Sequence, residues 1–235
     1  HMDVYRRLCC SHLCLVFEQL GQNLYEILKQ RQFRGLPLTC VQSIVSQILQ
    51  GLRDISQKHI VHSDLKPENI LLTSLKGSND LIAAGESRKR HAKKNSSTCS
   101  TKECCSSGID STSAGENLSH SDSSETFKVK LIDFGSASFE GYVSHDYIQS
   151  WFLRIPEVLT GQAYDSVIDM WSLGCVAAEL FLGLPILPGI HEHDQLCRIT
   201  EMIAALPEWM LDHGTKVKKY YIKVLSKPMA SPGNN

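Results

Sequence analysis

A change of composition in the middle of the chain sets the first limit on its fold. Residues 73–128 are rich in Ser, Thr, Lys and Gly and hold few large apolar residues, whereas the segments on either side carry regular apolar patterns. A segment of this kind cannot bury enough apolar surface to offset the entropy lost on ordering. We therefore predict that residues 73–128 form a disordered insert between two ordered parts.

The first ordered part contains a predicted strand followed by two predicted helices. The run HLCLVF at 12–17 favours a buried strand, and NLYEILKQ after it has apolar residues at helical spacing. Thr39 and Gln42 form a capping-box pattern before a longer helix. That helix is predicted from apolar residues at steps of three and four along one face: Val41, Ile44, Val45, Ile48, Leu49, Leu52 and Ile55.

The second ordered part begins with a predicted strand and continues with two predicted helices. KVKLIDFGSA gives a strand that ends at Asp133, where Gly135 allows a sharp turn behind the carboxylate. The stretch 166–183 is apolar nearly all round, so it should be a buried central helix with Asp169 as a hydrogen-bonded structural acid. A further amphipathic helix beginning near Asp194 is indicated by Leu196, Ile199, Ile203 and Leu206.

The octapeptide HSDLKPEN at 62–69 is the strongest candidate site. Two short apolar runs, 60–61 and 70–72, bracket it, so we expect a loop held between strands. Asp64 could accept a hydroxyl proton, Lys66 could neutralise a transferred phosphoryl group, and Asn69 could give an oxygen to Mg²⁺. Asp133, at a strand end before glycine, is also suited to bind a metal. The alternative for 62–69 is a solvated polar turn.

Charge and cysteine content exclude several classes of protein. The 24 basic and 25 acidic residues give a net charge of -1, so no overall field favours nucleic acid or an anionic membrane. The most apolar stretch, VAAELFLGLPILPGI, is interrupted by Glu179, Gly183 and two prolines and should not span a bilayer. The nine cysteines lack regular spacing, which predicts reduced thiols rather than disulfides or a zinc site. The basic run RKRHAKK at 88–94 is either solvated linker charge, an anion-binding patch or a nuclear-import signal.

Four motifs together resemble the protein kinases. HSDLKPEN, DFG at 133–135, PEV at 156–158 and DMWSLGC at 169–175 stand in the order of the kinase signatures. LVFEQLGQNLYEILK, SHDYIQS and AAELFLGLPILPG resemble the dual-specificity tyrosine-regulated kinases, and most of all their Yak-type branch. The resemblance implies a mostly α, protein-kinase-like fold with small β elements. Residues 1–20 would be a remnant of the small lobe and the hinge, 21–72 the first part of the large lobe with the catalytic loop, and 129–235 its incomplete remainder.

The implied activity is transfer of the γ-phosphate of ATP to protein serine or threonine hydroxyls, with tyrosine autophosphorylation in the activation loop. Asp64 and Lys66 would be catalytic, and Asn69 and Asp133 would bind Mg²⁺. Tyr147 would be the autophosphorylated residue and Arg154 its charged partner. The adenine pocket would be formed by Phe17 as gatekeeper, the backbone of Glu18 and Leu20, and Leu71 and Ile132 at its floor. The expected partners are ATP and proteins with Ser or Thr, but neither membranes nor nucleic acid, in the cytoplasm or nucleus.

Several positions depart from the family pattern. Ser63 stands where the catalytic loop usually has Arg or Cys, Trp151 replaces a basic residue, and Ile155 replaces a small one. The chain contains neither a Gly-rich phosphate loop nor the V-A-I-K lysine with its partner glutamate helix. We therefore expect a fragment truncated at both ends and without activity alone. The alternative function is a pseudokinase-like binding module, and nucleic-acid binding through residues 88–94 is a third.

Overall fold

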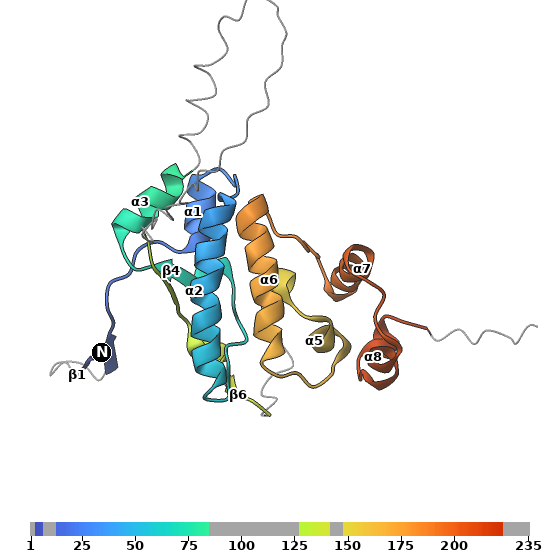
Figure 1. Ribbon diagram of the computed structural model, residues 1–235. Coiled ribbons are helices and arrows are strands. Elements are labelled where there is room, and N and C mark those ends of the chain that lie inside the picture. The colour runs from blue at the N-terminus through green and yellow to red at the C-terminus, as the bar shows by residue number, and fades with distance from the viewer. Residues whose placement is uncertain (1–2, 7–12, 85–126, 142–147, 223–235) are drawn as a thin grey trace, which may run out of the picture.

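The computed structural model describes residues 3–6, 13–84, 127–141 and 148–222, and this part of the chain is mostly helical (Figure 1). The strands are short and pair antiparallel in three two-stranded sheets. The predicted fold class, mostly α with small β elements, is confirmed. The predicted basic run 88–94 and Tyr147 lie outside the described residues.

Two of the sheets join the segments before and after residues 73–128. β1 (Asp3–Arg6) pairs with β2 (Leu13–Val16), which confirms a strand within 12–17. The predicted burial is wrong where it can be described, because Val16 is 46% and Phe17 68% exposed. β3 (Ile60–Val61) pairs with β6 (Ser138–Phe139), and β4 (Ile70–Leu72) pairs with β5 (Val129–Leu131). The loop 62–69 runs between β3 and β4, as predicted. Since the partners of both strands flank residues 132–137, the pairing brings the DFG turn beside this loop.

Helices α1 (Leu24–Gln30), α2 (Leu38–Ser56) and α6 (Val167–Leu182) surround the core. Asn23 caps α1, because its side chain accepts a hydrogen bond of 2.7 Å from Glu26 N. The capping box predicted at Thr39 and Gln42 is wrong. Pro37 has an extended backbone and α2 begins directly after it, so Thr39 already lies in the first helical turn and cannot act as the cap.

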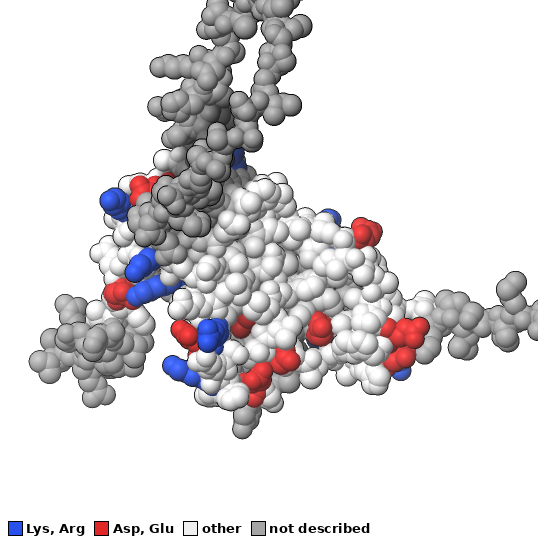
Figure 2. Space-filling model, in the orientation of Figure 1, with Lys and Arg blue, Asp and Glu red and all other residues white. Residues whose placement is uncertain are grey.

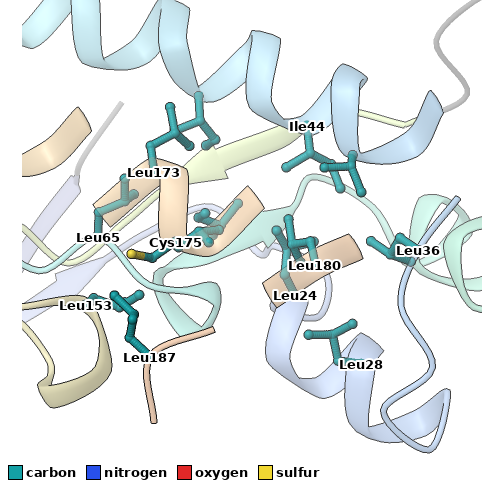
Figure 3. Close-up of a cluster of buried hydrophobic side chains, with 14 of the residues drawn as sticks. Leu24, Leu28, Leu36, Ile44, Leu65, Leu153, Leu173, Cys175, Leu180 and Leu187 are labelled. Carbon is teal, nitrogen blue, oxygen red and sulfur yellow. The ribbon is translucent and has the colours of Figure 1, made fainter. Parts of the chain in front are cut away.

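One continuous core connects these helices to the candidate catalytic loop. Leu65 in the loop is 1% exposed, and Figure 3 shows it in one cluster with side chains of α1, α2 and α6. Burying one leucine in this way contributes about 1.5–3 kcal/mol. The core therefore fixes the loop at the residue between Asp64 and Lys66.

The central helix α6 is less buried than predicted. Ile168, Leu173, Val176 and Leu180 are buried, but Val167, Met170, Phe181 and Leu182 are each about half exposed within the described part of the chain. The apolar pattern all round the helix predicted burial all round, but α2 and the loops cover only one side. In Figure 2 the charged side chains lie at the left edge and across the lower part of this face, and the surface over the upper parts of α2 and α6 is largely uncharged.

A helix inside residues 73–128 corrects the prediction that the whole segment is disordered. α3 (Leu75–Ala83) begins after Ser74, whose hydroxyl accepts a hydrogen bond of 3.2 Å from Gly77 N. Leu81 is 1% exposed and Phe127, at the far end of the segment, is 9% exposed. The polar average composition of the segment gave no sign of this helix. Its formation depends on the Ser74 cap and on Leu81, which is buried where α3 packs against α1. Residues 85–126 lie outside the described ranges.

The remaining helices are α5 (Pro156–Thr160), α7 (Glu192–Met202) and α8 (Glu208–His213). α7 is the helix predicted near Asp194, with Leu196 and Ile199 buried. It ends at Met202, so Ile203, which is 60% exposed, and Leu206 lie outside the helix, and α8 begins after Pro207. None of the helices in the described ranges combines the length and apolar character that crossing a lipid bilayer requires.

Candidate active site

The carboxylate of Asp64 is held by three side chains. Lys66 Nζ donates to Oδ2 at 2.7 Å, and Asn69 Nδ2 donates to the same oxygen at 3.2 Å. Ser150 Oγ donates to Oδ1 at 3.1 Å. The structure thus brings together the three residues that the octapeptide pointed to, with the carboxylate fixed in orientation and only partly exposed.

Asp169 shapes the backbone that presents Asp64. Its carboxylate, 3% exposed, accepts hydrogen bonds from the backbone N–H of His62 at 2.7 Å and of Ser63 at 2.9 Å. Burial raises the pKa of Asp169, and the two N–H donors oppose that effect. The predicted role of Asp169 as a hydrogen-bonded structural acid is confirmed. Ser63 has a φ of 65°, a left-handed backbone that these bonds hold in place.

His62 connects the loop 62–69 to the turn at 133–135. Its Nε2 lies 3.0 Å from Ile132 O, and its Nδ1 lies 3.3 Å from Asp64 N. A carbonyl can only accept and a backbone N–H can only donate, so these partners assign the neutral tautomer with the proton on Nε2. The ring also meets Phe134 edge to face, with centroids 4.9 Å apart. Movement of the DFG turn would therefore disturb the residue that bonds to Asp64 N.

Asn69 and Asp133 are the candidate metal ligands. Asn69 Nδ2 donates to Asp64 O at 2.9 Å, which leaves the amide oxygen Oδ1 to accept or to bind a cation. Ile132 N donates to Asn69 O at 2.9 Å, so the chain entering Asp133 is bonded to Asn69. Asp133 is exposed, with a φ of 65°, and accepts from Gly135 N at 3.2 Å. The described residues contain no group of three or more His, Cys, Asp or Glu side chains placed to bind a metal by themselves.

The residues predicted for the adenine pocket lie along one segment and the β4–β5 hairpin. Phe17, the predicted gatekeeper, is 68% exposed in the part of the chain that the structure describes. Glu18 forms an ion pair with Lys130 of β5. Leu20, Leu71 and Ile132 are half-buried, and Leu71 also pairs with Asn23 in a β-bridge. The segment 17–23 and the predicted pocket floor are thus adjacent.

Arg154, the predicted partner of a phosphate on Tyr147, is 2% exposed. Its Nε donates to Ile148 O and its second terminal nitrogen donates to Gln149 O, both at 3.0 Å. Its guanidinium also lies 4.6 Å from the centre of the Trp151 ring. Trp151, which replaces a basic residue of the family pattern, therefore stacks on the arginine that remains.

Ser150 and Gln149 are site residues that the sequence analysis missed. Gln149 N donates to Ser63 O at 3.1 Å, and its side chain bonds Ile168 O, Ser172 and Ile155 N. These bonds place Ser150 against Asp64, a residue 86 positions earlier. No short pattern around Ser150 signals such a distant contact.

A pocket of about 250 Å³ is lined in part by Lys66 and Ser150. Aromatic residues and two carboxylates line it, among them Tyr25, Phe33, Glu68, Ser150, Phe152 and Glu179. Burial, with the Glu68 carboxylate nearby, raises the pKa of Glu179 to about 7. The pocket shares with the hydrogen-bonded centre the side chains of Lys66 and Ser150, which both donate to Asp64.

Comparison with known proteins gives one consistent result. The family model for the protein kinase domain matches residues 2–108 and 115–230. The chain is 44% identical over 211 residues to the serine/threonine-protein kinase ppk15 of Schizosaccharomyces pombe, covering 90% of this chain and 30% of that protein. It is 37% identical over 221 residues to the dual specificity protein kinase YAK1 of Saccharomyces cerevisiae, covering 94% of this chain and 21% of that protein. It is also 36% identical over 211 residues to the DYRK-family kinase pom1 of S. pombe, covering 90% and 15%. The chain thus spans less than a third of the length of each of these relatives.

Proposed function

This chain belongs to the protein kinase family, and we propose that its Asp64 centre is the large-lobe part of a site that transfers the γ-phosphate of ATP to protein serine or threonine hydroxyls. The observation that carries the proposal is the binding of Asp64 by Lys66, Asn69 and Ser150. Its relatives include serine/threonine and dual-specificity kinases, which supports these acceptors.

Asp64 is suited to orient an acceptor hydroxyl. Its Oδ1 already accepts a hydrogen bond from the hydroxyl of Ser150, which is the type of bond that a substrate hydroxyl would make. The hydroxyl oxygen attacks the γ-phosphorus, the bond to the bridging oxygen breaks, ADP leaves, and the proton passes to Asp64. Lys66, 2.7 Å from Asp64 Oδ2, would counter the negative charge of the transferring group.

Members of the protein kinase family generally use ATP with Mg²⁺. The residues present fit that ion, because Asn69 Oδ1 and the exposed Asp133 carboxylate are oxygen donors and Mg²⁺ takes one or two carboxylates together with phosphate oxygens. When bound, the ion supplies positive charge to the phosphates. Asn69 and Asp133 would hold it, while the bond from Ile132 N to Asn69 O keeps the two segments together.

We also propose that Tyr147 is autophosphorylated and that Arg154 pairs with its phosphate. The support is the position of Tyr147 in SHDYIQS and the location of Arg154 within the segment that follows it. Arg–phosphate bonds are charge-assisted and would order this segment.

The test is transfer of radiolabelled phosphate from ATP to a basic protein substrate. Because the sequence has no Gly-rich loop and no V-A-I-K lysine, the chain alone should give no transfer above background. A fusion that adds the small lobe of a Yak-type kinase upstream should be active, and Asp64→Asn should lower its kcat at least about 100-fold. Asp54→Asn, an exposed change on α2, is the matched control. Equal activity of the Asp64→Asn and parent fusions would refute the proposed role of Asp64.

A further inference from the structure

Arg31, the residue that follows α1, binds the C-terminal end of helix α3. One terminal nitrogen of Arg31 donates to Leu81 O at 3.1 Å, Ile82 O at 2.6 Å and Ala84 O at 2.8 Å. Its Nε and other terminal nitrogen donate to Arg34 O and Gly35 O. A cation that bonds the last carbonyls of a helix stabilises that end. Arg31 therefore joins α3 to the turn after α1. Figure 1 shows the two helices next to each other.

The N-terminal half of α3 touches residues 21–22. Ser78, 1% exposed, donates to Ser74 O and accepts from Gln22 N, each at 3.4 Å. A Cβ added at Gly21 would lie 2.8 Å from Ser74 O, so the two backbones approach as closely as glycine allows. A Cβ at Gly77 would lie 2.9 Å from the Cβ of Phe127. The first turn of α3 is thus packed between residues 21–22 on one side and Phe127 on the other.

The β4–β5 hairpin does not need α3 as a connection. Thr73 N donates to Lys128 O at 2.9 Å, so the chain leaves and returns at the same place. A short turn could close such a hairpin. What α3 adds is a contact with Gly21 and Gln22, which directly follow the segment 17–20 assigned above to the adenine.

We infer that α3 is a positioning element for the adenine-binding segment, held by Arg31 and acting through Ser78. The inference rests on the proposed function for the identity of the ligand, but the contact itself can be tested without it. The segment is bonded on its other side to β4, since Gly21 N donates to Leu72 O at 2.7 Å and Leu72 N donates to Gln22 O at 3.0 Å. Gln22 therefore lies between β4 and α3, and loss of the α3 contact should loosen it on one side only.

The first experiment measures amide hydrogen exchange in the 235-residue chain by NMR. Ser78→Ala should speed exchange of the Gln22 amide about three- to tenfold, because it loses its acceptor, while the Gly21 amide, which donates to Leu72, should not change. Asn79→Ala, an exposed change on the same helix, is the control. Arg31→Met should speed exchange through α3 and at Gln22, whereas Arg34→Met, which alters an exposed side chain, should do neither. Unchanged Gln22 exchange in Ser78→Ala and Arg31→Met would overturn the inference.

The second experiment measures the affinity of the same variants for ATP carrying a fluorescent N-methylanthraniloyl group, with Mg²⁺. Ser78→Ala and Arg31→Met should raise the Kd about two- to fivefold, and the two control variants should leave it unchanged. If the parent chain binds and all variants bind equally, α3 does not position the segment for nucleotide and the inference is wrong. If the parent chain binds no nucleotide, the exchange comparison alone decides whether α3 holds Gln22, and the Asp64→Asn comparison in the fusion remains the test of the proposed function.

Discussion

Asp169 and Ser63, 106 positions apart, form a hydrogen bond that fixes the backbone of the loop 62–69. Asp169 Oδ1 accepts from Ser63 N at 2.9 Å, and Ser63 has the left-handed φ of 65°. The other carboxylate oxygen of Asp169, Oδ2, accepts a hydrogen bond from His62 N at 2.7 Å. Helix α6 thus sets the direction in which the chain enters Asp64.

Asp169→Asn should therefore lower stability. An amide has only one acceptor oxygen, so one of the two buried N–H groups loses its partner, which costs about 1–3 kcal/mol. Urea unfolding of the chain measures the loss, with Asp54→Asn as an exposed control. An Asp169→Asn chain as stable as the control would mean that the two bonds contribute little to holding the loop.

The pH dependence of stability should carry a contribution from Glu179. Its pKa is raised from an ordinary 4.5 to about 7, mainly by burial, so the folded state favours the protonated form. The stabilisation is complete below about pH 4.5 and is lost as the pH rises through about 7. Between pH 5 and 8 the parent should lose on the order of 1–2 kcal/mol more than Glu179→Gln, less than the full shift implies because solvent screens a carboxylate in an open pocket.

Unfolding curves of the parent and Glu179→Gln at several pH values give this difference. Glu201→Gln, a change at an exposed position of α7, should follow the parent at every pH. Parallel curves for the parent and Glu179→Gln would show that Glu179 ionises normally in the folded chain.

Two deletions should separate α3 from the rest of the segment that contains it. Replacing residues 85–126 by a flexible linker of about ten residues should leave stability nearly unchanged, since loop closure depends only weakly on length. Deleting 76–126 removes the buried Leu81 and the partners of Arg31, and should cost about 2–4 kcal/mol. Urea unfolding distinguishes the two. Equal stability of the two variants would mean that α3 contributes nothing to the stability of the fold.

Local patterns predicted most of the elements and the centre of the site. Strands β3, β4 and β5 and helices α1, α2 and α6 follow from apolar spacing, and Asp64, Lys66 and Asn69 fall within eight residues, so one turn brings them together. Ser150 could not be predicted, because its contact with Asp64 depends on how Gln149 is bonded to Ser63 and Ser172. The predicted start of α2 is wrong for a related reason. A capping-box pattern shows only that Thr39 and Gln42 could cap a helix, whereas α2 begins at Leu38, directly after Pro37.

The stack of Trp151 on Arg154 leads to the last prediction. A guanidinium 4.6 Å from an aromatic centre, in a site where it is 2% exposed, is a desolvated cation–π contact worth about 1–2 kcal/mol. Trp151→Leu removes the ring without adding charge and should lower the free energy of unfolding by about that amount. Trp151→Arg restores the basic residue of the family pattern, and should cost more in the unphosphorylated chain because it places a second cation beside the first.

The same substitution should have the opposite effect once a phosphate is present. In the fusion with a small lobe, phosphorylated Tyr147 would offer a dianion to both arginines, so Trp151→Arg should stabilise the phosphorylated enzyme and raise its initial rate. Both gains should vanish in a Tyr147→Phe background, which makes the comparison a double-mutant cycle. If Trp151→Arg raised the rate equally with tyrosine and with phenylalanine at 147, the arginine would be acting elsewhere. The buried Ile155, which stands in the family's small-residue position, would then be the next residue to change.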